Sequence, residues 1–212
     1  MGQPVEPSEA SVTPPLSRKR RQTQARLLDA ALDAFAERGF YGTSVEDVCE
    51  RAGFTRGAFY SNFGTKEELL VALYDRQADG ILATLTDLAP AAGGAPDAPL
   101  DAVLAELVAA IPQDRRWFLV STEFALHAVR DPAAGAAYAA ARARVRASFA
   151  DRFAEVLARF GRELTVSLDD LIRWLFAVHD GGLAQSYVEP GALAPNDVTR
   201  QVTPLLVAAV TR

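Results

Sequence analysis

Residues 53–69 read GFTRGAFYSNFGTKEEL, a stretch that sets aromatic residues among small, hydroxyl-bearing and basic ones. Phe59 and Phe63 are four residues apart and would share one buried face of a short helix. Glycine costs about 1 kcal/mol relative to alanine inside a helix, so a glycine on the outer face indicates close approach of a bulky partner. The residues predicted for that exposed, hydrogen-bonding face are Thr55, Arg56, Gly57, Tyr60 and Asn62.

A longer amphipathic helix is predicted just upstream. Its apolar positions recur at i, i+3, i+4 and i+7, and they are Leu28, Ala31, Leu32 and Phe35. Gly39 follows this stripe and is predicted to stop the helix in a left-handed conformation. Thr43 stands three residues before Glu46, which predicts a capping box at the start of a short second helix. Gly53 is the predicted end of that second helix.

The quoted stretch supplies a third helix, predicted over about residues 56–62, which Thr55 caps and Gly64 ends. Thr65 and Glu68 form a second predicted capping box, which opens a long helix toward Leu88. Two short capped helices joined by a tight glycine-containing turn predict a helix-turn-helix unit. In such a unit the outer face of the second helix suits DNA, where arginine reads guanine and hydroxyl groups mostly hold phosphates.

The rest of the chain is also predicted to be helical. A break rich in proline and glycine covers residues 89–99, and no segment sustains the alternation typical of a strand. The fold class predicted is therefore all-α, a three-helix head on a larger helical body with about nine helices in total. The later helices are expected near 100–111, 114–130, 132–160, 168–188 and 195–211. The expected divisions are a disordered leader at 1–16, a DNA-binding domain at 17–66 and a helical body at 67–212.

Composition and charge favour a soluble cytoplasmic protein that presents one end to DNA. Half of the 212 residues are hydrophobic, and Cys49 is the single cysteine. No apolar run approaches the roughly 18 residues that a membrane span needs, so no membrane association is expected. Residues 17–66 carry nine basic and six acidic side chains, a net charge of +3, whereas residues 67–212 carry 13 basic and 19 acidic ones, a net charge of −6.

The segment from Ala30 to Asp75 resembles the DNA-binding domain of the TetR family of transcriptional regulators. The resemblance rests on the turn at Phe40–Ser44, the core RAGFTRGAFYSNF at Arg51–Phe63 and the KEEL that follows Thr65. With the basic lead-in it covers about 60 of the 212 residues. Many members have histidine where this chain has Asn62, and an asparagine can still donate to a phosphate.

The resemblance implies double-stranded DNA as a partner and gives roles to individual residues. Thr43 or Ser44 would contact a backbone phosphate, Arg56 would read a base in the major groove, and Lys66 would meet phosphate at a helix N-terminus. A basic arm would follow the backbone or enter the minor groove, although such a run also suits a solvated helix start. The implied contacts are Arg18, Lys19, Arg20, Arg21, Thr43, Ser44, Thr55, Arg56, Gly57, Tyr60, Asn62 and Lys66.

A small-molecule pocket is predicted in the body, where aromatic residues occur beside a few polar groups. The candidate lining is Trp117, Ser121, Phe124, His127, Tyr138, Trp174 and Asp180, with His179 next to the last, although the same residues also suit an ordinary core. Glu123 and His127 are four apart and could pair or ligate a metal. Because the chain has two histidines and no cysteine lies near them, neither a metal site nor a cofactor is expected.

The resemblance also implies a homodimer built from the last two long helices. The expected interface residues are Leu171, Leu175, Val178, Gly182, Leu205, Leu206 and Ala209. Such a dimer would read a pseudo-palindromic operator with half-sites roughly 34–36 Å apart, and an unknown small-molecule inducer would release it. The alternatives are a ligand-independent activator or architectural protein, and an enzyme that uses the body cavity. No catalytic motif supports the enzyme, for which Glu123, His127 and Asp180 are the only constellation.

Overall fold

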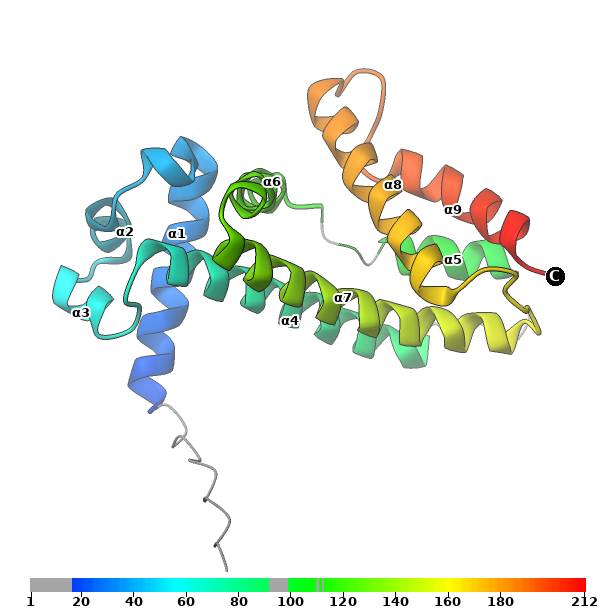
Figure 1. Cartoon of the computed structure of the whole chain (residues 1–212), viewed down its shortest axis with the longest axis horizontal. Coiled ribbons are helices and arrows are strands. Elements are labelled where there is room, and N and C mark those ends of the chain that lie inside the picture. Colours follow the sequence, from blue (N-terminus) through cyan, green and yellow to red (C-terminus); the bar gives the residue numbers. More distant parts are fainter. Residues whose placement is uncertain (1–16, 92–98, 110, 112) are drawn as a thin grey trace, which may run out of the picture.

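The computed structural model describes residues 17–91, 99–109, 111 and 113–212, and Figure 1 shows that the regular structure in these ranges is helical. The all-α prediction is confirmed, with nine helices and no strand among the described residues. The predicted leader, most of the proline- and glycine-rich break and Pro112 lie outside those ranges. The helices are α1 (Arg18–Gly42), α2 (Val45–Ala52), α3 (Arg56–Tyr60), α4 (Lys66–Ala91), α5 (Leu100–Ala109), α6 (Arg115–Arg130), α7 (Pro132–Arg159), α8 (Leu168–Val188) and α9 (Asp197–Val210).

Helices α1, α2 and α3 form a head at one end of an elongated molecule (Figure 1). Phe35, Phe40, Val48 and Phe59 are buried together in its core. Gly39 interrupts α1 with φ 77° and ψ 162°. The predicted stop is therefore at the right residue, and its positive φ favours glycine, but its ψ lies outside the left-handed helical region.

The N-terminus of α2 is capped one residue later than predicted. Ser44, not Thr43, is the N-cap: its hydroxyl accepts from Asp47 N at 3.1 Å, and Asp47 accepts from Ser44 N at 2.8 Å. Thr43 is instead buried, and its hydroxyl is directed at the Gly39 carbonyl, 2.8 Å away. Gly53 ends α2 in the left-handed conformation, as predicted, with φ 70° and ψ 36°.

The quoted stretch forms a shorter helix than predicted, because α3 ends at Tyr60. Thr55 caps it as predicted, accepting from Ala58 N at 3.2 Å. Thr65 likewise accepts from Glu68 N at the start of α4, at 3.0 Å. The second capping box is altered, however, because the Glu68 carboxylate accepts from Gly64 N at 2.7 Å rather than from Thr65.

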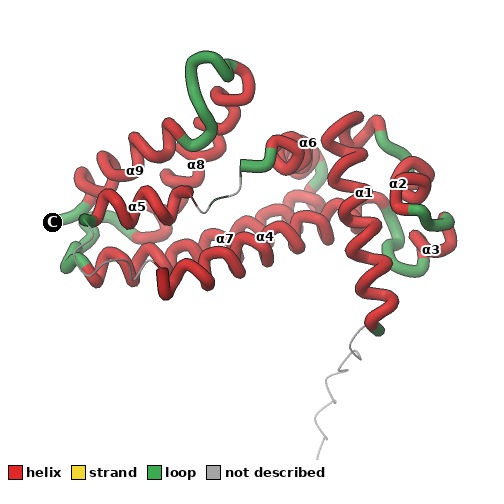
Figure 2. Tube along the Cα trace, turned by 180° about the vertical axis from the view of Figure 1, so that it is seen from behind, coloured by secondary structure: helices red, strands yellow, loops and turns green. Residues whose placement is uncertain are grey.

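Helices α4 and α7 lie side by side along the length of the molecule and join the head to its far end (Figures 1 and 2). Helices α5, α8 and α9 pack at that far end around a second core that includes Leu104, Phe153, Leu171 and Ile172. Helix α6 packs against both α1 and α7. None of the described helices is both long enough and apolar enough to cross a membrane.

Candidate DNA-binding surface and ligand pocket

The outer face of α3 is exposed, as the sequence predicts. Thr55, Arg56 and Gly57 are exposed, and 49% of Tyr60 is accessible. A Cβ built on Gly57 would meet only the Thr55 hydroxyl at 3.7 Å, an ordinary contact. The fold itself therefore does not require a glycine at this position, and the space over it is open to a partner.

Arg56 is held over this face by its neighbours. Its guanidinium pairs with the Glu46 carboxylate of α2 at 2.8 Å and lies 5.9 Å from the centre of the Tyr60 ring. Both partners of the ion pair are more than half exposed, and an exposed pair of this kind contributes only about 0–1 kcal/mol. The pair can therefore orient Arg56 and still give way to a stronger anion or a base edge.

Asn62 does not present its amide outward. Its Nδ2 donates to the Ala58 carbonyl at 2.8 Å and lies 3.3 Å from the Ser61 hydroxyl, while its Oδ1 is buried. The amide therefore closes the end of α3. Because both of its donors are already occupied inside the head, we do not propose Asn62 as a DNA contact.

Lys66 and Thr43 are also engaged inside the head. The Lys66 ammonium donates to the carbonyls of Phe40 and Thr43 at 2.7 and 2.8 Å and lies 4.3 Å from the centre of the Phe40 ring. The Thr43 side chain is 1% exposed. Both residues fix the turn between α1 and α2, so we do not propose them as phosphate contacts. Ser44, which is exposed, remains the candidate at this turn.

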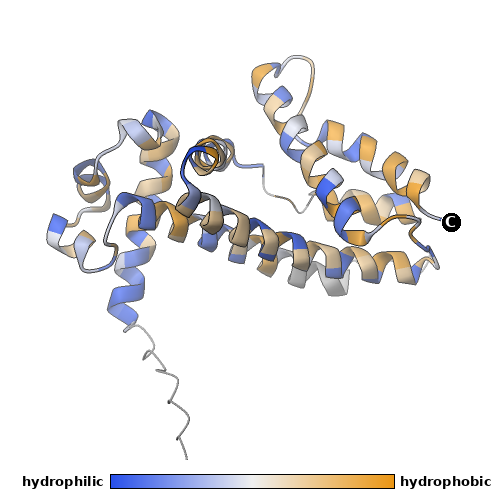
Figure 3. Ribbon diagram, in the orientation of Figure 1, coloured by the Kyte–Doolittle hydropathy of each residue, from blue (hydrophilic) through white to orange (hydrophobic). Residues whose placement is uncertain are grey.

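The basic run is the first turn of α1, not an extended arm. Ser17 caps this turn by accepting from Arg20 N at 3.3 Å. Arg18, Lys19, Arg20 and Arg21 are all exposed, no acidic residue lies in that turn, and Figure 3 shows it as a hydrophilic end of the helix. A helix of this diameter does not enter a minor groove as an arm does, so of the two predicted roles we propose only contact with the phosphate backbone. The Arg20 guanidinium donates to the Ser61 carbonyl at 3.1 Å, which places the run beside α3.

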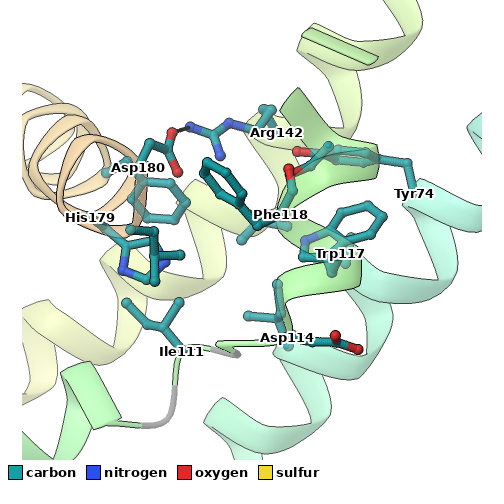
Figure 4. Close-up of a pocket in the computed structure, with 14 residues that line it drawn as sticks. Tyr74, Ile111, Asp114, Trp117, Phe118, Arg142, His179 and Asp180 are labelled. Atoms are coloured by element: carbon teal, nitrogen blue, oxygen red, sulfur yellow. Dashed lines mark hydrogen bonds and ion pairs between the residues drawn. The ribbon is translucent and has the colours of Figure 1, made fainter. Parts of the chain in front are cut away.

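A pocket of about 70 Å³ lies between α4, α6, α7 and α8. Figure 4 shows its aromatic wall, and we call it the aromatic pocket. The predicted residues Trp117, Ser121 and Asp180 line it. The residues that the sequence analysis did not single out, and that also line it, include Tyr74, Asp114, Phe118, Arg142 and Phe176.

The charged groups of the aromatic pocket are paired. Arg142 donates to Asp180 at 2.6 Å and lies 5.1 Å from the centre of the Phe176 ring. Asp114 pairs with Arg116 at 2.9 Å, and this hydrogen bond holds the pKa of Asp114 below its usual value. Burial raises the pKa of Tyr74, so its hydroxyl stays neutral.

His179 also lines this pocket, and it is the second of the chain's two histidines. Burial lowers the pKa of its imidazole. The ring is therefore neutral at pH 7, since an imidazole normally titrates near 6.5.

Four predicted pocket residues lie elsewhere. Phe124 is 1% exposed and belongs to the core that joins head and body. Tyr138 packs on Phe124, with ring centres 5.2 Å apart. Trp174 is 41% exposed on α8 and does not line the aromatic pocket. His127 lies at the head, where it and Phe124 line a second, wider groove. These four residues therefore lie outside the aromatic pocket, although two of them line another cavity.

Three side chains of α6 make polar contacts with α1. Glu123 Oε2 accepts from Phe40 N at 2.5 Å, and His127 Nδ1 lies 2.9 Å from the Tyr41 hydroxyl. Arg116 pairs with Asp33 of α1 at 2.8 Å. We call these contacts the α1–α6 junction. Glu123 and His127 thus bind the head rather than each other.

A wider groove of about 660 Å³ lies beside the junction, between the start of α4 and the corner of α6 and α7. Its lining includes the acidic residues Glu67, Glu68, Asp75 and Asp131. Asp75 is paired with Arg144, and Asp131 caps α7. Among the described residues, no cluster of three or more histidine, cysteine, aspartate or glutamate side chains is arranged to hold a metal ion.

Several predicted interface residues are buried inside the chain itself. Leu171 and Leu175 belong to the core at the far end of the body, and Leu206 packs against it. A Cβ on Gly182 would lie 2.9 Å from Val198 Cβ, so this glycine lets α8 approach α9 within one chain. Leu171, Leu175 and Gly182 are therefore occupied within one chain, whereas Leu206 is only partly buried and stays a predicted interface residue. Val178 is partly buried and Ala209 is exposed. The large apolar side chains exposed on α8 and α9 are Trp174 at 41%, Val188 at 79% and Leu205 at 69%.

Comparison with known proteins finds a family match for the head and another for the body. The family described as "Bacterial regulatory proteins, tetR family" matches residues 27–73. The family described as "BetI-type transcriptional repressor, C-terminal" matches residues 96–210, more than half of the chain. The HTH-type transcriptional regulator TtgR of Pseudomonas putida is 46% identical over 55 residues. That alignment spans 26% of this chain and 26% of TtgR, so it covers only about a quarter of the relative.

Solved structures show the same fold over most of the chain. The regulator FadR of Bacillus subtilis, in complex with stearoyl-CoA, has a TM-score of 0.71 and 16% identity, over 88% of this chain and 98% of that one. A putative regulator from Saccharomonospora viridis, in complex with choline, also has a TM-score of 0.71 and 16% identity, over 91% and 99% of the two chains.

Proposed function

Because the chain belongs to the TetR family of DNA-binding transcriptional regulators, we propose that it is a homodimeric repressor released from its operator by a small molecule. The family is one of regulators and not of enzymes. The observation that carries the proposal is the position of α6. Helix α6 and its N-cap Asp114 line the aromatic pocket, to which α6 contributes Trp117 and Ser121. The same helix contacts the head through Glu123 and His127.

Residues 17–66 form the proposed DNA-binding unit, with α3 in the major groove. Arg56 reads a base, because its exposed pair with Glu46 keeps the guanidinium extended over the outer face. The helical basic run follows the phosphate backbone beside α3. The proposed contacts are Arg18, Lys19, Arg20, Arg21, Ser44, Thr55, Arg56, Gly57 and Tyr60.

Residues 67–212 form the proposed effector-binding and dimerisation unit. The dimer interface is the outer face of α8 and α9, where Trp174, Val188 and Leu205 expose large apolar side chains. Val178, Leu206 and Ala209 adjoin them and are retained from the sequence prediction. A two-fold axis through this face presents two heads to a pseudo-palindromic operator with half-sites roughly 34–36 Å apart.

Release follows from the coupling of the pocket to the head. An effector that enlarges the aromatic pocket by displacing α6 also strains the α1–α6 junction, because the same helix makes both. Arg116 makes this link direct, because it pairs both with Asp114 of the pocket and with Asp33 of the head. The effector therefore favours head positions that no longer fit both half-sites, provided that it binds those positions more tightly.

Fluorescence anisotropy tests the proposal with the DNA immediately upstream of the chain's own gene and a random duplex of equal length. We expect binding to the first duplex to be tighter by about a thousandfold or more, with two chains per site. An in vitro transcription assay on the same DNA then separates repression from activation. Equal, steeply salt-dependent binding to several upstream and random duplexes would support the architectural alternative instead.

The matched variant for the release mechanism is Glu123→Gln, which keeps the shape of the side chain and removes its charge. It weakens the hydrogen bond to Phe40 N, so we expect operator affinity and effector response to change together. Glu155→Gln, on the opposite part of the body and paired only with Arg152 in the same helix, should change neither.

A further inference from the structure

Four buried polar atoms gather beneath the aromatic pocket. They are His179 Nδ1 and Asn196 Oδ1, whose side chains interact with each other, and Thr199 Oγ1 and Thr203 Oγ1, which have no hydrogen-bond partner among the described residues. The four side chains are only 7%, 4%, 2% and 1% exposed, in that order. Buried polar groups are almost always hydrogen-bonded in folded proteins, so two threonine hydroxyls without partners beside this pair indicate a site for a ligand group.

Three of these residues line a cavity of about 20 Å³ that we call the inner cavity. His179 comes from α8, and Thr199 and Thr203 lie one turn apart on α9. The remaining lining is apolar and includes Val108, Phe149 and Phe153. The wall of the inner cavity is almost wholly apolar, so a ligand group reaches the two hydroxyl groups and the ring nitrogen only after these side chains turn toward it.

The inner cavity continues from the aromatic pocket. Ile111, Phe176 and His179 line both of them. Figure 4 shows Ile111 and His179 on the side of the aromatic pocket opposite Tyr74 and Trp117. A molecule in the aromatic pocket would therefore approach the inner cavity between Ile111, Phe176 and His179, on the side of the pocket opposite Tyr74 and Trp117.

Neither space offers an unpaired charge. Arg142 is paired with Asp180, and Asp114 with Arg116. A buried charged ligand would lose its hydration without gaining a counter-ion, unless it broke one of these pairs. A hydroxyl or carbonyl group, in contrast, can exchange hydrogen bonds with threonine hydroxyls and a neutral imidazole in either direction.

We propose that the effector is an uncharged molecule whose flat apolar part lies in the aromatic pocket and whose hydroxyl or carbonyl group enters the inner cavity. There it hydrogen-bonds with His179, Thr199 and Thr203. This inference rests on the proposed function, in which the aromatic pocket holds the effector. The ligand class differs from the choline cation and the anionic acyl-CoA bound by the two structural relatives.

Four probes with one benzene ring and one substituent test the class: benzyl alcohol, toluene, benzoate and benzylammonium. Each is titrated into the full-length protein without DNA, with affinity measured by calorimetry. The side-chain ¹⁵N spectrum provides a local readout, because the chain has two histidines and His127 lies at the head. We expect benzyl alcohol to shift the His179 Nδ1 resonance and to bind about tenfold or more tightly than either charged probe. Tighter binding of a charged probe, or no shift of His179 with benzyl alcohol up to its solubility, would overturn the proposal.

Thr199→Val and Thr203→Val remove one hydroxyl each at nearly constant volume. We expect both to raise the midpoint of thermal unfolding, because an unpartnered buried hydroxyl is lost. Both should weaken benzyl alcohol binding by about fivefold while leaving the affinity for toluene unchanged. The matched control is Thr165→Val, whose hydroxyl donates to the Val210 carbonyl at 3.0 Å; it should lower the midpoint and leave binding unchanged.

The inner cavity is also large enough to hold one ordered water molecule. If the threonine hydroxyls bind only such a water, Thr199→Val would lower the midpoint of thermal unfolding and leave benzyl alcohol binding unchanged. That result would overturn the inference. Operator binding is followed by anisotropy in the same titrations. Binding with the expected chemistry but without DNA release would support the inference and count against the repressor mechanism.

Discussion

Lys66 and Lys19 are the two lysines of the chain, and replacing each by methionine separates a structural cation from a DNA-binding one. Methionine keeps an unbranched stem of similar length and removes the ammonium group. The Lys66 ammonium donates to two carbonyls and lies over an aromatic ring, whereas the Lys19 side chain is exposed on the first turn of α1. We therefore expect Lys66→Met to lower stability without changing the contacts to DNA, and Lys19→Met to weaken DNA binding without changing stability.

The size of the effect follows from the contacts of Lys66. A hydrogen bond from a charged donor contributes about 1.5–3 kcal/mol and a cation–π contact about 0.5–1 kcal/mol. Because Lys66 is partly exposed, we expect Lys66→Met to lower the free energy of unfolding by about 2–4 kcal/mol in total. For a chain of this length that corresponds to a fall in the unfolding midpoint of about 5–12 °C. Lys19→Met should stay within about 0.5 kcal/mol of the unsubstituted protein.

Salt dependence of operator binding supplies the second readout. Each neutralised phosphate contributes about −0.9 to the slope of log K against log salt concentration, so one lysine per chain contributes about 1.8 in a dimer. Lys19→Met should reduce the slope by that amount. Lys66→Met should leave the slope unchanged at temperatures where the head is folded. A stable Lys66→Met protein with the reduced slope would refute the reasoning and restore Lys66 as a phosphate contact.

Three further predictions concern the rest of the molecule. Gly182→Ala should destabilise the protein by about 1–2 kcal/mol, since its Cβ would lie 2.9 Å from Val198 Cβ and overpacking outweighs the gain in helix propensity. Gly80→Ala should stabilise the protein by about 0.4–1 kcal/mol, because its Cβ would meet nothing within 4 Å. Chemical denaturation measures both free energies of unfolding. The free energy of unfolding should fall as pH drops below 6.5, the usual pKa of a histidine in the unfolded chain. Burial lowers the pKa of folded His179, so at low pH the unfolded chain binds a proton that the folded chain does not. The thermal unfolding midpoint should therefore decline less between pH 8 and pH 5 in His179→Leu. Thr43→Val should lower the free energy of unfolding by about 1–2 kcal/mol, because its buried hydroxyl is hydrogen-bonded, without changing the salt dependence of DNA binding.

The head could be predicted from the sequence because its determinants are local. Caps, helix-ending glycines and the four-residue spacing of Phe59 and Phe63 act within a few residues of one another. The errors arose where two neighbouring residues share the same chemistry. Thr43 and Ser44 can both cap a helix, and only the tertiary position of the turn decides which hydroxyl is buried.

The body could be predicted only as a set of helices. Periodicity shows which residues share a face, but it does not show whether that face meets the chain's own core or a second chain. Leu171 was therefore predicted for the interface and Trp174 for the pocket, although the first is 0% exposed and the second 41%. The lining of the aromatic pocket was predicted only in part for a related reason. Tyr74 and Arg142 reach it from helices far apart in the sequence, and neither belongs to a local motif.

The size of the aromatic pocket bears on how an effector would act. A space of about 70 Å³ is well below the roughly 300–1,000 Å³ of most small-molecule sites, so a larger effector requires the surrounding helices to separate. Helix α6 is the wall that is also tied to the head, through Glu123, His127 and Arg116. Loss of one or two of those contacts, at about 0.5–1.5 kcal/mol each, matches the 1–3 kcal/mol of a typical allosteric coupling. By linkage, operator DNA must then weaken effector binding by the same factor, and an effector whose affinity is unaffected by DNA would act through some other wall of the pocket.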